Sequence, residues 1–375
     1  METVAVLAAP PARPPGMRTR LRVLGLTQSA TDPASRFRFV QFMPHLERAG
    51  WQVEHRPNRP DREWRSHLNP RAARAVHYRL GRGLMRLSRF RDVEAAGGYD
   101  VVFVNRDLAG AGSFLERRLL QRNPRVVFDF DDAIFVGPRN EALIRWLCAN
   151  AAWVTPGNEY LAEWAGNFTD RVTVLPTVID TERYASREAV DPPGELVRVG
   201  WSGSDSSIGV TLLPYLDLLA RLQAALPFDL VVVSNTRPQL PTRGLRWSFR
   251  PWSPSAEGRI GEWFDIGIMP LLDNEFQRGK CGLKLLQYMA AGLPAVASPV
   301  GVNARIVQHG MTGYLASAPD DWGAALEALI RSPEARARMG AAGRSRCEEH
   351  FSVRRWLPEL MAVLSRAAGA GAEGT

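Results

Sequence analysis

The chain has 375 residues, a length that suits two domains better than one small core. Hydrophobic residues make up 45% and charged residues 23%, as in an ordinary soluble globular protein, and no apolar run is long enough to span a bilayer. The three cysteines have neither paired nor metal-ligand spacing, which argues against a disulfide framework and indicates a reducing, cytoplasmic compartment.

The first elements predict the opening of a doubly wound domain. Residues 1–17 combine an apolar stretch with four prolines and no preceding basic run, which favours a disordered leader over a signal peptide, and Met17 is a second candidate start of translation. A strand at 21–26, a polar loop and a helix ending at Gly50 follow, an order that puts ligands at the carboxyl end of the strand. Arg36 and Arg38, near the start of that helix, either bind an anion or solvate the helix surface.

The net charge of +8 comes from one segment. Residues 56–91 hold eleven arginines against two acids, a net of +9, so the rest of the chain is close to neutral. At 100° per residue, an apolar stripe occupies one third of a helix and most of the arginines lie on the other side. The stripe consists of Val76, Leu80, Leu84, Leu87 and Phe90, and the basic face of Arg71, Arg74, Arg79, Arg82, Arg86 and Arg89.

This basic segment has two interpretations. A basic amphipathic helix suggests peripheral contact of residues 71–91 with an anionic membrane surface. The alternative is a helix packed on its own domain with a solvated arginine face. Aromatic residues are sparse in the segment and no nucleic-acid-binding motif is present, so a polynucleotide partner is not favoured.

Two further strands end in charged residues. The strand at 99–108 ends in Asn105 and Arg106, and the strand at 125–135 runs into Asp129, Asp131 and Asp132. Acids packed together at the end of a strand raise one another's pKa or gather a cation. The cluster therefore contacts substrate in a cleft, forms a metal site of the Asp-x-Asp kind, or caps the following helix, and we favour substrate contact.

The middle of the chain contains a domain joint. Residues 151–165 predict a strand, a Pro-Gly turn and a helix entered at Asn158 and Glu159, and SREAVDPPGE (186–195) is the clearest linker. Residues 196–209 then predict a strand and a Gly/Ser loop holding Gly203 and Ser204, before a helix from about Thr211. The amides and hydroxyls of that loop suit a diphosphate, although a plain turn would have the same composition.

The stretch 273–301, DNEFQRGKCGLKLLQYMAAGLPAVASPVG, is the centre of the second half. It predicts a polar, glycine-rich loop to Gly282, a helix ending before Gly292, and a short strand at 295–297. Lys280 and Lys284 are the only lysines among 47 basic residues. Because lysine is a compact charge and a helix start binds anions, we favour a phosphate site over two surface lysines of no consequence.

The stretch GKCGLKLLQYMAAGLPAVASPVGVNARIVQHGMTGYLA resembles the donor-binding segment of the retaining glycosyltransferases of family 4. Two glutamates separated by seven residues usually bracket the loop in that family, whereas Gly279 and Gln287 stand at those positions here. SRFRFVQFMPHLERAG and DFDDAIF resemble one branch of the same family. Members usually carry an arginine and a lysine in the loop at 203–209, and their absence here makes Lys280 and Lys284 the natural substitutes.

The resemblance implies an α/β protein of the GT-B fold, with two Rossmann-like, doubly wound domains facing a cleft. We expect an acceptor domain over 18–185, a linker at 186–195, a nucleotide-sugar donor domain over 196–350, and a last helix at 351–368 that crosses back to the first domain. The resemblance also implies a retaining, metal-independent hexosyltransferase without a cofactor. Such an enzyme moves sugar from a nucleotide diphosphate sugar to a glycan, lipid-linked or small-molecule acceptor, typically in polysaccharide or cell-envelope biosynthesis.

Roles for single residues follow from the resemblance. Lys280 and Lys284 stabilise charge on the leaving phosphate, Asp131 and Asp132 position the acceptor or the transferred sugar, and Gln287 hydrogen-bonds the ribose. Further donor-binding candidates are Gly203, Ser204, Trp252, Arg278, Gly279, Gly282 and Leu283, with Trp252 either stacking on the base or packing. Acceptor-binding candidates are Arg36, Arg38, Arg106, Asn158 and Glu159. The alternatives are a nucleotide-sugar epimerase or phosphorylase of the same fold, or a catalytically silent sugar-nucleotide-binding partner in a membrane complex.

Overall fold

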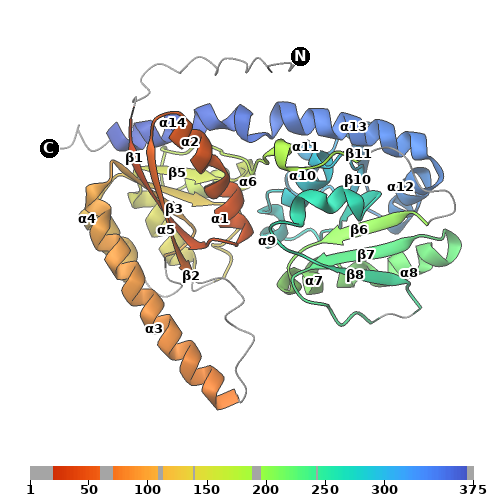
Figure 1. The fold of residues 1–375 in the computed structure, drawn as a ribbon, viewed down its shortest axis with the longest axis horizontal. Coiled ribbons are helices and arrows are strands. Elements are labelled where there is room, and N and C mark those ends of the chain that lie inside the picture. Colours follow the sequence, from red (N-terminus) through yellow and green to blue (C-terminus); the bar gives the residue numbers. More distant parts are fainter. Residues whose placement is uncertain are drawn as a thin grey trace, which may run out of the picture.

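The computed structural model describes residues 20–59, 71–108, 113–137, 140–187, 196–241 and 244–369. The expected leader and most of the expected linker lie outside these residues. Two separate parallel sheets organise the rest, one in each half of the chain (Figure 1). None of the helices in the described ranges is long and apolar enough to cross a bilayer.

The first half builds a five-stranded sheet in the order β2-β1-β3-β4-β5. All of its strand pairs are parallel, so the strands end at a common edge. The strands are β1 (Arg22–Ser29), β2 (Gln52–Arg59), β3 (Val101–Asn105), β4 (Val126–Phe130) and β5 (Trp153–Pro156). Its helices are α1 (Pro33–Arg38), α2 (Met43–Arg48), α3 (Arg71–Ala95), α4 (Phe114–Arg122), α5 (Glu141–Asn150) and α6 (Glu159–Gly166).

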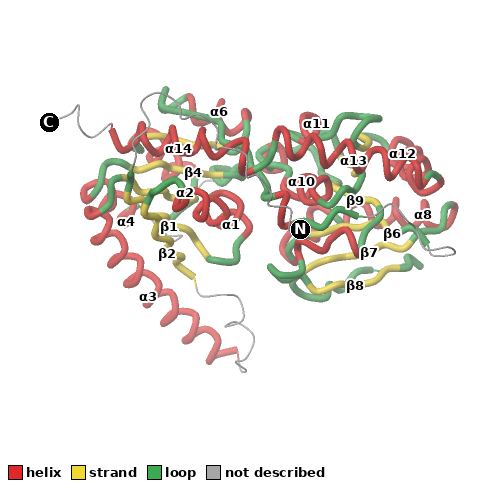
Figure 2. The backbone as a smooth tube through the Cα atoms, turned by 45° about the horizontal axis from the view of Figure 1, so that its top comes forward, coloured by secondary structure: helices red, strands yellow, loops and turns green. Residues whose placement is uncertain are grey.

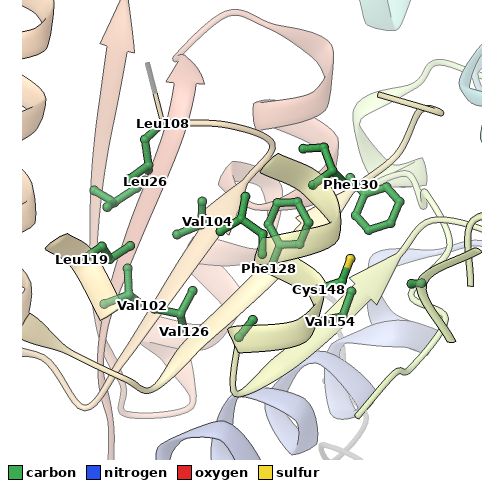
Figure 3. Packing of buried hydrophobic residues seen from close by; sticks show 14 of the residues in the cluster. Leu26, Val102, Val104, Leu108, Leu119, Val126, Phe128, Phe130, Cys148 and Val154 are labelled. Carbon is green, nitrogen blue, oxygen red and sulfur yellow. The ribbon is translucent and has the colours of Figure 1, made fainter. Parts of the chain in front are cut away.

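Both faces of this sheet are buried, which is why β3 and β4 begin with consecutive rather than alternating apolar residues and are buried along their whole length. On one face, Val102, Val104 and Phe128 pack with residues of α4 and α5 (Figure 3). On the other face, Val101 and Phe103 pack against the last helix of the chain, α14 (Val353–Gly369). This helix returns from the second half to cover the first sheet, as expected for a crossing helix.

The second half builds a six-stranded parallel sheet in the order β11-β10-β9-β6-β7-β8. The strands are β6 (Arg198–Ser202), β7 (Asp229–Ser234), β8 (Trp247–Pro251), β9 (Ile266–Met269), β10 (Ala295–Ala297) and β11 (Gly313–Leu315). Its helices are α7 (Asp205–Thr211), α8 (Leu216–Ala225), α9 (Glu275–Arg278), α10 (Leu283–Ala290), α11 (Asn303–Ile306), α12 (Pro319–Arg331) and α13 (Pro333–His350).

Strand β6 lies at the point where the order of this sheet reverses, and α10 packs under β9 beside it. In open parallel sheets, ligands bind at the carboxyl ends of strands at such a switch point. The helix after β6 begins at Asp205, six residues earlier than the sequence predicted, because Ser204 rather than a later residue stands at its start. The helix at 283–290, the left-handed Gly292 (φ 70°) and the strand at 295–297 follow the prediction.

Candidate active site

The loop between β9 and α10 presents the two lysines at the interface of the two halves. Gly282 precedes α10 with φ 69°, a left-handed conformation that glycine adopts without cost. Lys280 lies in the loop, 5.0 Å from the ring of Phe276, and Lys284 lies in the first turn of α10, 5.5 Å from the ring of Trp201. The two ammonium groups thus sit beside a helix start, where backbone amides favour anions.

The acids of the first half meet these lysines. Arg106 follows β3 in a left-handed conformation (φ 63°), which is uncommon for a residue with a side chain. It donates to Asp131 at 2.9 and 3.1 Å and to Asp132 at 2.7 Å. Across the interface, Lys280 Nζ lies 3.8 Å from Asp132. Residues from both sheets therefore converge at one place, which no local sequence pattern states.

One interpretation of the acidic cluster loses support. Helix α5 begins only at Glu141, behind Asn140, so Asp131 and Asp132 do not cap it. Arg106 pairs with both of these carboxylates, which holds them at the interface of the two halves. Substrate contact remains the interpretation that the geometry favours for Asp131 and Asp132.

The charges in this site perturb one another. The pKa of Lys284 is lowered to about 7, mainly by burial and also by the nearby charge of Lys280, while Asp132 opposes the shift. Burial also raises the pKa of Asp132, an effect that Lys280 and Arg106 offset only in part. For Asp131, burial again acts upward, but the charges of Arg106 and Arg38 outweigh it and the pKa is lowered. Near neutral pH, Lys284 is therefore partly in its neutral amine form, which is poised to gain a proton when an anion arrives.

A close contact between the halves lies next to the lysines. The side-chain amide of Asn158 donates to the carbonyls of Gly279 at 3.0 Å and Lys280 at 3.3 Å, while its oxygen caps α6 by accepting from Leu161 N at 2.9 Å. A Cβ atom on Gly279 would lie 2.6 Å from Ala133 N of the first half. A glutamate at position 279 has no room in this arrangement, which gives a physical reason for the glycine.

Gln287 is committed to a polar chain that spans the two halves. Its side chain is only 6% exposed, and its amide donates to Glu257 at 2.6 Å and to the Tyr184 hydroxyl at 3.4 Å. Glu257, in the 3₁₀ helix η6 (Glu257–Glu262), also forms an ion pair with Arg36 of the first half. Arg36 lies 5.5 Å from the ring of Trp252. Arg36, Tyr184 and Glu257 line a cavity of about 390 Å³ between the halves.

Glu257 was missed by the sequence analysis. It stands in an unpatterned loop, SAEGRIGEW, thirty residues before its partner Gln287, and nothing local distinguishes it from a surface acid. The buried amide of Gln287 needs an acceptor, and a carboxylate supplies it. Glutamine stands where the family usually has a glutamate, and a carboxylate is instead supplied to this place by Glu257 of η6.

The remaining residues predicted to bind donor or acceptor lie in several different places. Arg38 is 1% exposed and bound to Asp129 at 2.6 Å, inside the first half rather than in a cleft, so its assignment to acceptor binding is corrected. Arg278 is paired with Asp273 at 2.6 Å on the surface. Gly203 packs on the ring of Trp201, which places it and its neighbour Ser204 beside the indole that Lys284 covers. Glu159 forms an ion pair with Arg305. Leu283 packs against buried hydrophobic residues of the second half.

Comparisons with known proteins agree with this geometry. A family model described as "Glycosyl transferases group 1" matches residues 215–332, which include both lysines and Gln287. The chain is 35% identical over 100 residues to a D-inositol 3-phosphate glycosyltransferase of Pseudarthrobacter chlorophenolicus, covering 25% of this chain and 23% of that protein. It is 39% identical over 97 residues to an N-acetyl-alpha-D-glucosaminyl L-malate synthase of Bacillus anthracis, covering 25% of each. The chain thus matches about a quarter of the length of these curated relatives.

Similarity to solved structures extends over nearly the whole chain. Sucrose-phosphate synthase from Thermosynechococcus elongatus superposes with a TM-score of 0.69 at 18% identity, covering 93% of this chain and 100% of that one. HepE of Anabaena, solved in complex with UDP-glucose, superposes with a TM-score of 0.63 at 16% identity, covering 91% and 98%. The fold is GT-B, with two Rossmann-like domains, and the fold class predicted from the sequence is confirmed.

Proposed function

We propose that this protein is a glycosyltransferase that moves a sugar from a nucleotide diphosphate sugar to an acceptor, with retention of configuration. The observation that carries the proposal is the convergence of Lys280 and Lys284 from the second domain with Asp131, Asp132 and Arg106 from the first. The match to the group 1 family model over residues 215–332 and the likeness to HepE, solved with UDP-glucose, support the same activity. Retention rests on the resemblance of the segment around α10.

The lysines fit the demands of the departing diphosphate. When the bond from sugar C1 to the phosphate oxygen breaks, negative charge grows on the phosphate, and a preorganised cation lowers that barrier most. Lys284, with its pKa near 7, takes up a proton as the diphosphate binds and meets it as a full positive charge. Lys280, four residues earlier in the loop and paired with Asp132, adds a second, weaker contact.

The acids face the incoming acceptor. The acceptor hydroxyl loses its proton as its oxygen bonds to C1, and a carboxylate with a raised pKa is suited to receive that proton. Asp132 has a raised pKa and accepts a hydrogen bond from Arg106 at 2.7 Å, which orients it. Asp131, with a lowered pKa, stays ionised and is assigned to positioning the sugar hydroxyls.

A donor assay on Lys284→Met tests the proposal. A panel of UDP- and GDP-sugars is screened by thermal shift, and the best donor is then used in binding and transfer assays. Lys284→Met should bind that donor at least about tenfold more weakly, since a hydrogen bond to a charged group contributes about 1.5–3 kcal/mol. Arg338→Met, which removes an exposed cation from α13 of the same domain, is the matched control and should bind like wild type.

Equal affinity of Lys284→Met and wild type would remove Lys284 from the site. A second candidate, a catalytically silent sugar-nucleotide-binding protein, is favoured by Gly279 and Gln287 standing where the family usually has glutamates. Such a protein would bind a nucleotide sugar and release no nucleoside diphosphate with any acceptor. An epimerase would change the sugar without releasing diphosphate, and a phosphorylase would need phosphate, so product analysis separates these outcomes.

A further inference from the structure

Helix α3 is attached to the first domain at one end only. Its last turns pack against the domain, with Val93 fully buried, and its earlier turns project away from the body in both views (Figures 1 and 2). The anchor includes Arg89, which is 0% exposed and donates to the carbonyls of Thr27 at 2.6 Å and Arg56 at 3.0 Å. An arginine of the expected solvated face is therefore buried.

Two residues of the apolar stripe face solvent, whereas Phe90 packs on the domain as the sequence leads one to expect. Leu84 and Leu87, one turn apart, are 64% and 51% exposed, although the sequence favoured a helix packed on its own domain through these residues. Phe114, at the start of the neighbouring helix α4, is 67% exposed and stacks on Phe90 of α3 with centroids 6.5 Å apart. Three large apolar side chains are thus uncovered along one side of α3 and α4.

The same region is strongly basic. From Arg71 to Arg91 the sequence holds seven arginines and no acid. Arg91 lies between Leu84 and Leu87 in angle around the helix, and Arg86 is exposed about 100° further round from Leu87, on the flank of the leucines. Apolar side chains flanked by arginines suit the surface of an anionic bilayer, which has acyl chains beneath charged headgroups. The apolar part of an arginine side chain can lie along the acyl chains while its guanidinium stays among the headgroups.

We propose that Leu84, Leu87 and Phe114, with Arg86 and Arg91, form a docking face that binds the surface of an anionic lipid bilayer. The leucines and the phenylalanine enter the boundary between headgroups and acyl chains, and the arginines contact the lipid phosphates. An ordinary protein partner would cover the leucines, but it would need acidic groups at its rim to match Arg86 and Arg91. The face lies on the first domain, which is also the proposed acceptor side.

The test is flotation of the full chain with vesicles of phosphatidylcholine containing 30% phosphatidylglycerol, compared with pure phosphatidylcholine. Wild type should float with the anionic vesicles and lose most of its binding when the salt is raised from 50 to 500 mM, because surface charges are then screened. The double variant Leu84→Gln/Leu87→Gln should lower the partition coefficient at least about tenfold, since two large apolar groups no longer leave water. Phe114→Ser should lower it less.

Two controls separate lipid binding from loss of structure. Met311→Gln removes an equally exposed apolar residue (62%) from the second domain and should float like wild type. Arg86→Gln/Arg91→Gln should remove the salt-sensitive part of binding while leaving the folded helix signal unchanged. Arg89 is unsuitable for such a test because its side chain is part of the core.

Absence of flotation by wild type overturns the proposal, and so does equal flotation by Leu84→Gln/Leu87→Gln. Sedimentation velocity without lipid gives a third outcome. A dimer of wild type that Leu84→Gln/Leu87→Gln converts to a monomer would show that the face joins two copies of the chain, which also overturns it. Transfer to a soluble acceptor is measured on the same samples, so failure of lipid binding and failure of the enzymatic proposal remain distinguishable.

Discussion

The two sides of the interdomain site hold their charges differently. On the first-domain side, Arg106 is paired with Asp131 and Asp132, and inside the same domain Arg38 is paired with Asp129, so these side chains are fixed before any ligand binds. On the second-domain side, Lys280 has one pair at 3.8 Å, and Lys284 has no hydrogen bond or ion pair within the part of the chain that the structure describes. The first side is a rigid, satisfied scaffold, and the second keeps positive charge available for an anion. Because the charges of the first domain are already paired and the lysines of the second domain are not fully paired, we expect the lysines to contribute most of the affinity for an anionic ligand.

Breaking the scaffold should have the largest effect. The carboxylate of Asp129 accepts from Arg38 at 2.6 and 3.1 Å, from Asn105 at 2.9 Å and from Thr155 at 2.8 Å. Asp129→Ala leaves the buried guanidinium of Arg38 unpaired, and the free energy of unfolding should fall by about 3–5 kcal/mol. Chemical denaturation measures the loss.

The exposed Asp170 provides the control for this prediction. Asp170→Ala lies in the same domain and should change the free energy of unfolding by less than about 0.5 kcal/mol. A loss for Asp129→Ala as small as that of the control would mean that the Arg38 pair is not the support of the first side.

Restoring the usual glutamate at position 287 should be the next largest effect. Gln287→Glu places a second carboxylate about one hydrogen-bond length from Glu257, whose partner atom now lies 2.6 Å away. Two like charges at that distance raise one another's pKa in the folded protein, so the folded form binds more protons than the unfolded chain. The variant should lose about 1–3 kcal/mol of folding free energy at pH 8, and less at pH 5 where the pair shares a proton.

Gln121→Glu, on the exposed surface of α4, is the matched substitution and should show no such pH dependence. Equal losses for Gln287→Glu at pH 5 and pH 8 would refute the repulsion. If the wild-type amide also contacts ribose, Gln287→Ala should raise the Michaelis constant for donor more than it lowers turnover.

Weakening the second side at Lys280 should have a smaller effect. Its ammonium group is partly exposed and shares its charge with Asp132, so Lys280→Ala should weaken donor binding about two- to fivefold. Because Lys280 lowers the pKa of Lys284, the variant should also shift the pH dependence of donor binding to higher pH. A shift to lower pH, or a loss of affinity larger than that of Lys284→Met, would contradict the assigned order of the two lysines.

The sequence predicted those parts whose signals are local. The strand at 295–297, the helix before Gly292 and the helix entered at Asn158 follow from apolar runs, a left-handed glycine and an N-cap, each readable within a few residues. The restriction of lysine to positions 280 and 284 likewise points to the side of the proposed site that the second domain supplies. The GT-B architecture was predicted from the alternation of strands and helices and from the resemblance to a family, and a solved GT-B structure that superposes on 93% of the chain confirms it.

What the sequence could not predict depends on contacts between distant residues. Arg36 and Arg38 stand two residues apart on one short helix, yet one reaches Glu257 across the interface and the other is sealed against Asp129. The helix at 71–95 was expected to bury its apolar stripe, but Arg89 bonds to backbone carbonyls of the first sheet and turns Leu84 and Leu87 outward. The helical periodicity of apolar residues predicts which side chains share a face of a helix, but it does not predict which face packs against the rest of the protein.

The pH dependence of donor binding shows most directly whether Lys284 is the group that receives the diphosphate. Burial lowers the pKa of Lys284 from its ordinary value of 10.5 to about 7, and a bound diphosphate should raise it again. Binding therefore takes up a proton, and affinity should fall as pH rises from 7 to 9, a range in which the phosphates no longer titrate. Calorimetry with UDP-glucose or GDP-mannose, whichever binds more tightly, should show a loss of about tenfold or more over that range for wild type. Lys284→Arg, which stays charged throughout, should show almost none. A wild-type affinity that does not change between pH 7 and 9, or an equal decline in Lys284→Arg, would contradict the assignment of Lys284 to the diphosphate.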